Sequence, residues 1–466
     1  MTRLSLLLPL ALLACPPPAE TDATDTESTD APQPTDDTDP PPPPDLPRIV
    51  EAEDLDPDPD HLRVRLVAAP HEFLVGDDMV SGYAYNEQVP GPTLRAKRGD
   101  RITAEIVNNL PVPTTVHWHG IHVPYPMDGV TWTEDPIAPG ETFVATFVVD
   151  QVGTFWYHPH FDTARQVDLG LYGAVIVTDP DDPIPDDDVV VIADSWGEAG
   201  AREGEGTDHH RIDGAGLVWT FNGALNPALR PPSGSTARVR FINASNTGYL
   251  AFPPADSWSW IAGDQGLRGA ASPGLELLAP GDRADAELSV GPDPAPLTVR
   301  PYTLNGGEVA PGDDVATLGM EPDGAASRPD SLAWPFSPVA PSADPGWTDL
   351  RFVLQGDAGG NDWTINGETF PDITVPALPL DAEAIVEVRN ISPTEHPFHI
   401  HGHAFEVLSV DGIPPTHQVF EDTFNVPIRS TVRLKLVADN PGSWMTHCHI
   451  LPHAKGGMMT IIDVGP

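Results

Sequence analysis

Short segments in which apolar and polar residues alternate occur throughout the chain. Residues 62–67, 143–149, 237–241, 385–389 and 432–437 follow this pattern. Alternation with a period of two places successive side chains on opposite faces of a β-strand. Turns rich in proline and glycine separate the segments, and amphipathic helical patterns are scarce. We therefore predict an all-β protein built from β-sandwiches.

The β-rich region divides into three parts. Segments rich in proline and aspartate at 179–188 and 311–345 interrupt the strand pattern, as linkers between domains do. The chain has 466 residues, which is enough for about three domains of roughly 100 to 150 residues each. We predict three related sandwiches, at residues 61–180, 181–325 and 326–466.

Residues 1–15 have the pattern of an export signal. Arg3 supplies a positive charge, residues 4–13 form an apolar stretch, and a small residue precedes Cys15. The stretch is too short to span a bilayer as a stable helix. Residues 12–15 resemble the lipobox of bacterial lipoproteins, which implies a lipid-modified Cys15; cleavage without a lipid is the alternative. We therefore expect an exported protein of a bacterial cell envelope, as a periplasm-facing or surface lipoprotein.

Residues 16–60 form an acidic segment that consists largely of proline, threonine and acidic side chains. They hold fifteen acidic side chains and one basic one, Arg48. Such a segment buries too little apolar surface to offset its ordering entropy, so we predict a disordered tether. The whole chain has a formal net charge of -45. Nucleic acid is not expected as a partner, because phosphate binding depends on clustered lysine and arginine, and membrane contact is expected only through the N-terminal lipid anchor.

Histidines gather in four short clusters, and the last cluster contains a cysteine. The clusters are His117-Trp118-His119, His158-Pro159-His160, His396-Pro397-Phe398-His399-Ile400-His401, and His447-Cys448-His449 followed by His453 and Met458. Residues i and i+2 of a strand point to the same face, so each His-x-His pair can aim two imidazoles at neighbouring metal ions. A site shared by all four clusters requires the two ends of the chain to meet in space.

The His447-Cys448-His449 triplet predicts copper. Strand alternation sends both imidazoles to one side and the thiolate to the other. Two imidazoles, one thiolate and a weak axial thioether form the blue-copper electron-transfer set, whereas a structural zinc site usually takes several cysteines. Cys448 can therefore bind one copper while its neighbours hold a different copper site a few covalent bonds away. A buried inert thiol is the alternative interpretation.

The chain resembles the multicopper oxidases from Asn86-Glu87-Gln88-Val89-Pro90-Gly91-Pro92-Thr93-Leu94 to Met459, with all four histidine motifs in family order. The resemblance implies three consecutive cupredoxin-like Greek-key β-sandwich domains and four copper ions, with a trinuclear cluster between the first and third domains. It assigns the type 1 copper to His396, Cys448, His453 and Met458; the type 2 copper to His117 and His399; one type 3 copper to His119, His158 and His449; and the other type 3 copper to His160, His401 and His447.

The implied reaction couples one-electron oxidation of a small reducing substrate to four-electron reduction of O2 to water. Electrons pass through Cys448 to His447 and His449. Oxygen reduction also needs protons, and Asp128 matches a family carboxylate near the trinuclear cluster, which makes it our candidate proton relay. A turn aspartate before Gly129 is the alternative reading of this residue.

Phenols or aromatic amines are the predicted substrates of a laccase-like enzyme, and a metal ion is a further candidate. A cuprous oxidase in copper tolerance is the alternative, although the chain has only seven methionines to offer soft ligands to Cu(I). A non-catalytic copper-binding or cell-envelope scaffold protein is the alternative of another class, and it would not need the complete ligand set. Glu395 and Glu421-Asp422 are acidic groups able to receive a substrate proton or a cation, or they are solvated loop charges.

Overall fold

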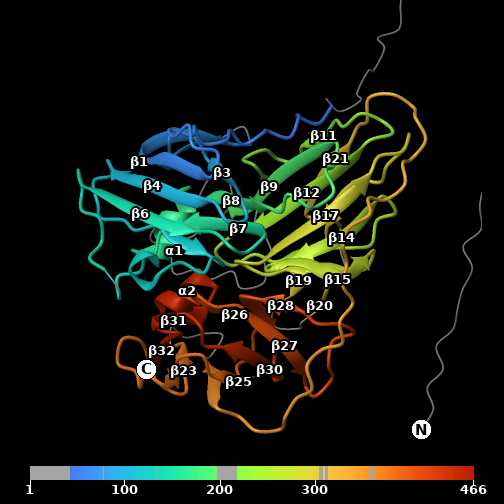
Figure 1. Cartoon of the computed structure of the whole chain (residues 1–466). Helices are drawn as coiled ribbons and strands as arrows, with labels where there is room; N and C mark the ends of the chain where they lie inside the picture. The colour runs from blue at the N-terminus through green and yellow to red at the C-terminus, as the bar shows by residue number, and fades with distance from the viewer. Residues whose placement is uncertain are drawn as a thin grey trace, which may run out of the picture. The chain divides into compact units, whose positions relative to one another are not determined.

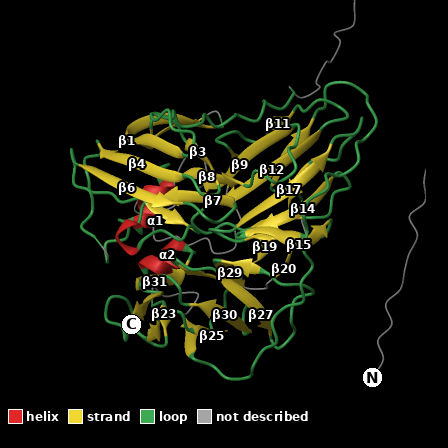
Figure 2. Ribbon diagram, viewed as in Figure 1, coloured by secondary structure: helices red, strands yellow, loops and turns green. Residues whose placement is uncertain are grey.

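The computed structural model describes residues 42–76, 78–132, 134–196, 218–303, 308–309, 313–356 and 362–465. Strands dominate these residues (Figure 2). The helical elements among them are the α-helices α1 (Thr163–Asp168) and α2 (Leu451–Lys455) and the 3-10 turn η1 (Tyr125–Met127). No helix in this part of the chain is long and apolar enough to cross a membrane. The all-β prediction is confirmed.

The first sandwich consists of two four-stranded sheets, in the orders β2-β1-β4-β6 and β3-β8-β7-β5. Its strands are β1 (His61–Val75), β2 (Asp78–Tyr85), β3 (Gly91–Lys97), β4 (Arg101–Asn108), β5 (His117–His119), β6 (Thr142–Val148), β7 (Gly153–His158) and β8 (Gly173–Thr178). Alternate residues of β1 and β4 are buried, so Val64, Ile102 and Val175 of facing sheets share one core.

The second sandwich has a six-stranded sheet in the order β10-β9-β12-β17-β14-β15 and smaller sheets β11-β21-β18, β13-β16 and β19-β20. Its strands are β9 (Asp187–Trp196), β10 (Val218–Phe221), β11 (Ala228–Leu229), β12 (Thr236–Asn243), β13 (Leu250–Phe252), β14 (Trp258–Gly263), β15 (Gly266–Ser272), β16 (Glu276–Leu278), β17 (Arg283–Ser289), β18 (Leu297–Val299), β19 (Tyr302–Thr303), β20 (Glu308–Val309) and β21 (Ala316–Met320). Phe241, Trp260 and Leu288 belong to its core.

The third sandwich pairs a six-stranded sheet, β23-β22-β25-β30-β27-β28, with a five-stranded sheet, β24-β32-β31-β26-β29. Its strands are β22 (Leu350–Gln355), β23 (Thr364–Ile365), β24 (Ala377–Pro379), β25 (Glu383–Asn390), β26 (His396–Ile400), β27 (Phe405–Val410), β28 (Phe420–Glu421), β29 (Thr423–Val426), β30 (Thr431–Val437), β31 (Gly442–Cys448) and β32 (Met459–Gly465). Its core contains Cys448 and Met458.

One pairing pattern recurs in all three sandwiches, which supports their relatedness. The first strand of each pairs antiparallel with the strand that follows it and parallel with a later one. The parallel pairs are β1 with β4, β9 with β12, and β22 with β25. The exact boundaries of the domains stay a prediction, because residues 43 to 466 form one compact unit.

The structure corrects the end of the predicted tether at residue 60. Leu46 is buried in the core of the second sandwich, and its backbone N–H donates to the oxygen of Ala228 at 2.9 Å. The N–H of Ala52 likewise donates to the oxygen of Thr93 at 2.8 Å. A few apolar side chains within the acidic segment are enough to hold it against the sandwiches. Residues 1–41, with the predicted signal peptide and most of the tether, lie outside the described residues.

The first and third sandwiches meet where the histidine clusters lie. Helix α1, which follows β7, contacts helix α2, which follows β31, and the two helices lie side by side in Figure 1. The chain therefore brings the ends of β5 and β7 close to the ends of β26 and β31, although more than half of its length separates them in sequence.

Candidate metal centre

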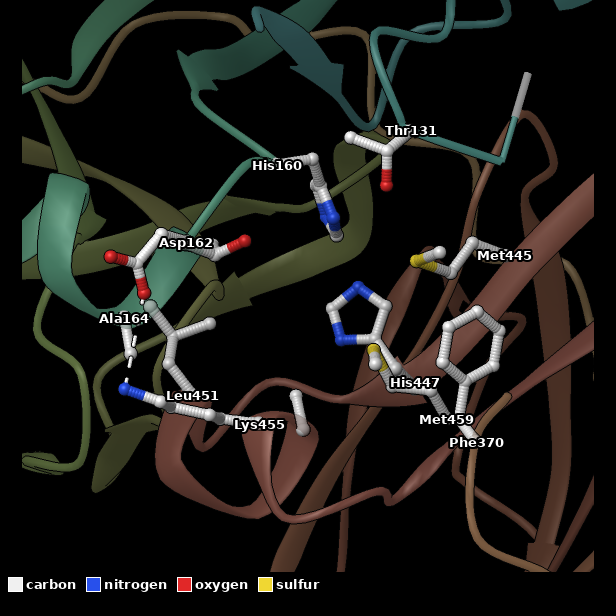
Figure 3. Close-up of a pocket in the computed structure, with 12 residues that line it drawn as sticks. Thr131, His160, Asp162, Ala164, Phe370, Met445, His447, Leu451, Lys455 and Met459 are labelled. Atoms are coloured by element: carbon white, nitrogen blue, oxygen red, sulfur yellow. Dashed lines mark ion pairs between the residues drawn. The ribbon is translucent and has the colours of Figure 1, made fainter. Parts of the chain in front are cut away.

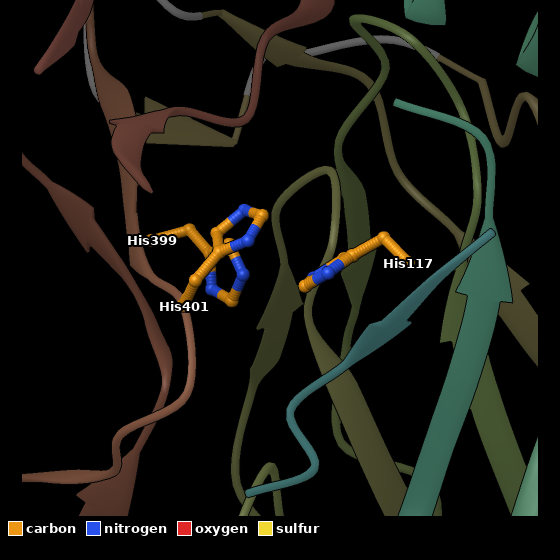
Figure 4. A group of neighbouring side chains, drawn as sticks. All are labelled: His117, His399 and His401. Carbon is orange, nitrogen blue, oxygen red and sulfur yellow. The ribbon is translucent and has the colours of Figure 1, made fainter. Parts of the chain in front are cut away.

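Eight histidines from the first and third sandwiches enclose one buried space. They are His117 and His119 on β5, His158 and His160 at the end of β7, His399 and His401 at the end of β26, and His447 and His449 at the end of β31. His117 stacks on His401 with 3.8 Å between ring centroids (Figure 4). The rings of His160 and His447 lie 5.2 Å apart (Figure 3). The structure thus brings the predicted cluster together from both ends of the chain.

Strand register places these imidazoles. His117 is directly opposite His158 in the antiparallel pair β5 and β7, and His399 is directly opposite His447 in the pair β26 and β31. Directly opposed residues of an antiparallel pair project from the same face of the sheet. Each sandwich therefore presents two facing His-x-His pairs to the other.

A smaller set of ligands surrounds Cys448. Its Sγ lies 3.4 Å from His396 Nδ1 and 3.7 Å from His453 Nδ1, and the two Nδ1 atoms are 3.2 Å apart. Met458 is fully buried in the same core. The Oγ atom of Ser392 lies 2.6 Å from His396 Nε2, which leaves the Nδ1 lone pair of His396 directed at the sulfur. This is the predicted imidazole, imidazole and thiolate set.

Cys448 joins the two sets of ligands covalently. Its sulfur lies in the core of the third sandwich, while the rings of its neighbours His447 and His449 belong to the eight-histidine cluster, with 5.6 Å between their centroids. The alternation predicted from the triplet places the thiol on one side of β31 and the imidazoles on the other.

Backbone carbonyls fix the tautomers of several cluster histidines. The Nδ1–H groups of His117, His399 and His447 donate to the oxygens of Asp128, Asp422 and Cys448 at 2.8, 2.9 and 3.0 Å. A neutral imidazole that donates from Nδ1 keeps its lone pair on Nε2. The Nε2 atoms of His117 and His399 are buried and accept no hydrogen bond from the described residues. Their lone pairs are therefore available to a metal ion.

The contact between His401 and His447 argues most directly for a bound cation. His401 Nδ1 lies 3.0 Å from Asp128 Oδ2, and His447 donates from its own Nδ1. The two Nε2 atoms then present lone pairs to each other across 3.1 Å. Two facing lone pairs repel unless a cation lies between or beside them.

Burial holds most histidines of the cluster neutral. Burial, together with the neighbouring histidines, lowers the pKa of His447 to about 3. The same causes hold the pKa values of His158, His160 and His449 well below the usual range. Burial raises the pKa of the Cys448 thiol, so its thiolate needs a bound cation for compensation. Neutral imidazoles and one cation-stabilised thiolate fit copper.

Comparison with known proteins identifies the family. Residues 71–182 and 345–466 each match multicopper oxidase domains. The chain is 30% identical to a multicopper oxidase, MmcO, of Mycobacterium tuberculosis over 85% of this chain and 86% of that protein. It is also 28% identical to laccase-5 of Trametes villosa, over 80% of this chain and 84% of that protein. The crystal structure of a multicopper oxidase from Pseudomonas thermotolerans has a TM-score of 0.74 at 30% identity and covers 87% of this chain and 99% of its own.

The chain belongs to the multicopper oxidases. It is therefore a copper-dependent oxidoreductase that uses O2 as electron acceptor, and its sandwiches are cupredoxin domains.

Two buried aspartates hold the outer nitrogens of this multicopper oxidase cluster. Asp128, in the loop after η1, lies 3.2 Å from His117 Nδ1 and 3.0 Å from His401 Nδ1. Asp422, between β28 and β29, accepts the Nε2–H of His119 at 3.0 Å, which leaves the His119 Nδ1 lone pair for a metal. Such carboxylates orient ligand rings and raise their basicity.

Asp422 also forms an ion pair with the second sandwich. Arg283 donates from both terminal nitrogens to its carboxylate, at 2.9 Å in the longer contact. Burial opposes ionisation, but the charge of Arg283 holds the pKa of Asp422 well below its usual range. Asp422 is therefore a charged group at the metal cluster, and the solvated loop charge considered from the sequence is wrong for this residue. Nothing in the sequence pattern marks Arg283, because its partner is 139 positions away.

Proposed function

We propose that the protein is a laccase-like oxidase that couples one-electron oxidation of phenols or aromatic amines to four-electron reduction of O2 to water. The position of Cys448 carries the proposal. Its sulfur faces His396 and His453, and the residues on either side of it belong to the eight-histidine cluster. Such an arrangement suits a protein that receives electrons one at a time and collects them at a second site.

The proposed copper assignment is the one that the family resemblance implies. The type 1 copper takes His396, Cys448, His453 and Met458; the type 2 copper takes His117 and His399; the type 3 coppers take His119, His158 and His449, and His160, His401 and His447. Two of these assignments have support in the structure. The ligand atoms of His396, Cys448 and His453 lie within 4.8 Å of one another, and so do those of His160, His401 and His447. Bound copper supplies the reversible one-electron chemistry that connects the substrate with O2.

Asp128 is the proposed proton relay. Its carboxylate is fully buried and lies within 3.2 Å of Nδ1 of both His117 and His401. A carboxylate at this place can hold a proton beside the cluster where water is formed. Burial and the charge of Asp128 raise the pKa of the half-buried Glu134 to about 7. Glu134 is therefore the group we propose to exchange protons between Asp128 and solvent.

The surroundings of the type 1 ligands favour an organic substrate over Cu(I). The indole of Trp363 stacks on the His453 ring at 3.7 Å. Among the buried residues that form the core around Cys448, Met458 is the one methionine, so soft ligands for an incoming Cu(I) ion are scarce on this side of the protein.

Oxygen uptake with matched reductants tests the proposal. Copper-loaded protein should have an intense blue colour from the bond between Cys448 and copper, and it should consume O2 faster with a phenol or an aromatic amine than with Cu(I) at equal concentration. The Cys448→Ser variant should lose the colour and the turnover. Faster O2 uptake with Cu(I) would instead assign a cuprous oxidase. Colourless copper-loaded protein, inactive with every reductant, would support a binding or scaffold role.

We also propose export and anchoring to a bacterial cell envelope through a lipid on Cys15. The support is the composition of residues 1–15, which lie outside the described residues. When cells that express the protein are given a radiolabelled fatty acid, the protein should become labelled. The Cys15→Ser substitution should abolish this labelling. Label retained by Cys15→Ser would refute the anchor.

A further inference from the structure

A cavity of about 180 Å³ lies between the first and third sandwiches, beside the eight-histidine cluster. Its walls come from β31, β32, α1 and α2 and from the loop that holds Thr131 (Figure 3). His160 and His447 line it, and both belong to the ligand group that also contains His401. The cavity therefore ends on the cluster itself.

His160 is the most accessible of the eight histidines. The other seven are each at most 1% exposed, whereas His160 is partly exposed. Among the described residues of the cluster, His160 is therefore the one nearest to solvent, although its Nε2 atom is itself buried.

Two methionines stand beside the end of the cavity that meets the cluster. Met459 is directly opposite His447 in the pair β31 and β32, and Met445 precedes His447 by two residues on β31. All three side chains therefore project from the same face of the sheet. In Figure 3 the sulfur atoms of both methionines lie next to the His447 imidazole.

Thioether sulfur is a soft ligand that selects Cu(I). Asp162, 38% exposed at its side chain, forms an ion pair with Lys455 at 3.9 Å and also lines the cavity. Lys455 lines the cavity as well and offsets this carboxylate, whereas the net charge of -45 favours cations over anions near the protein surface. The donors that line the cavity are therefore a carboxylate, two thioethers and two imidazoles.

We propose that this cavity is the route by which Cu(I) reaches the trinuclear cluster, with Met445 and Met459 as transient ligands that pass the ion to His447 and His160. Each transfer exchanges a thioether for an imidazole at an unchanged Cu(I) oxidation state, so it needs no reductant. The inference rests on the proposed trinuclear copper assignment. It differs from a cuprous oxidase activity, because the ion becomes a resident cofactor instead of a substrate.

Copper loading of the copper-free protein tests the route. Met445→Leu/Met459→Leu keeps apolar volume and removes both sulfurs. Anaerobic Cu(I) is added, and samples withdrawn over time are analysed for bound copper and, after exposure to air, for the blue type 1 band and the near-ultraviolet type 3 band. Removing partners of a metal site typically weakens metal affinity about 10- to 100-fold. We expect the type 3 band to develop at least about tenfold more slowly in the double variant, with type 1 loading unchanged.

Two further proteins make the result decisive. Met79→Leu, at an exposed methionine on β2, should load like the wild type. Thr131→Phe, at an exposed residue that lines the cavity, should slow loading by both Cu(I) and Cu(II), whereas the methionine variant should slow Cu(I) alone. If the double variant loaded Cu(I) into its type 3 pair at the wild-type rate, the thioether role would be overturned. If Thr131→Phe took up copper at the wild-type rate, the route would be overturned. Blue, active enzyme after prolonged loading would show that the oxidase function itself stands.

Discussion

Replacing Arg283 with glutamine tests how the second sandwich supports the metal cluster. Arg283 is completely buried, and its guanidinium donates to the Asp422 carboxylate and to the carbonyl oxygens of Thr154, Gly281 and Asp264, at 3.1, 3.1 and 3.2 Å. Thr154 belongs to the first sandwich and Asp422 to the third. One side chain therefore ties three sandwiches together at the carboxylate that holds His119.

The expected loss of stability follows from the burial of the ion pair between Arg283 and Asp422. Removing one partner of a buried ion pair typically costs about 3 to 5 kcal/mol, because the other charge is left uncompensated. Burial already raises the pKa of Asp264, which faces Arg283, to about 7. In the variant, Asp422 loses the partner that lowers its pKa, so it gains a proton more readily. The penalty is therefore largest at neutral and alkaline pH and shrinks as the pH falls.

Urea unfolding of the copper-free protein, followed by tryptophan fluorescence, measures this loss. Arg48→Gln is the matched control, since Arg48 also makes a bidentate contact with an aspartate, Asp187, at 3.1 and 2.5 Å. The Arg48 side chain is 55% exposed, and exposed pairs contribute at most about 1 kcal/mol. The type 2 copper signal in electron paramagnetic resonance should also shift in Arg283→Gln, because Asp422 orients His119 and its backbone oxygen accepts from His399.

Equal losses of stability in Arg283→Gln and Arg48→Gln would refute this reasoning. So would a type 2 signal in Arg283→Gln that is identical to that of the wild type. A stability loss without a spectral change would mean that Arg283 only joins the sandwiches and does not position the ligands.

Three further predictions follow from the site. Asp128→Asn should lower kcat about 100-fold with the blue band retained, and stopped-flow reoxidation by O2 at wild-type rate would contradict the relay. Glu134→Gln should remove a pH dependence of kcat near pH 7, the value to which burial raises its pKa; an unchanged pH profile would exclude Glu134 from the proton path. Copper-free protein should lose stability as the pH falls from about 6.5 toward 3. In this window the unfolded chain protonates its histidines, whereas burial keeps the pKa of His447 and His396 at about 3 in the folded protein. A urea midpoint that is constant between pH 7.5 and pH 5 would contradict this prediction.

The sequence predicted the strands and the ligand residues because both depend on short-range patterns. Alternation along residues 62–67 and 432–437 reappears as alternate burial on β1 and β30. The spacing in His447-Cys448-His449 determines which way each side chain points, so the separation of thiol from imidazoles needed no tertiary information.

Tertiary contacts explain what the sequence did not predict. Arg283 and Asp422 are joined only when the second and third sandwiches pack, and an aspartate near Glu421 has the same local pattern whether it is solvated or buried. Residues 43–60 have the composition of a disordered tether, yet Leu46 finds a place in the core of the second sandwich. Both outcomes depend on surfaces that distant segments provide.

Copper content and spectra of wild type and Cys448→Ser, measured side by side, test whether Cys448 links the two sets of ligands. The wild type should hold one type 1, one type 2 and two type 3 coppers. Cys448→Ser should lose the blue band and keep the type 2 and type 3 signals. Electrons given to that variant should no longer reach the trinuclear cluster. A Cys448→Ser protein that keeps its blue band, or that oxidises phenols at the wild-type rate, would contradict this role of Cys448.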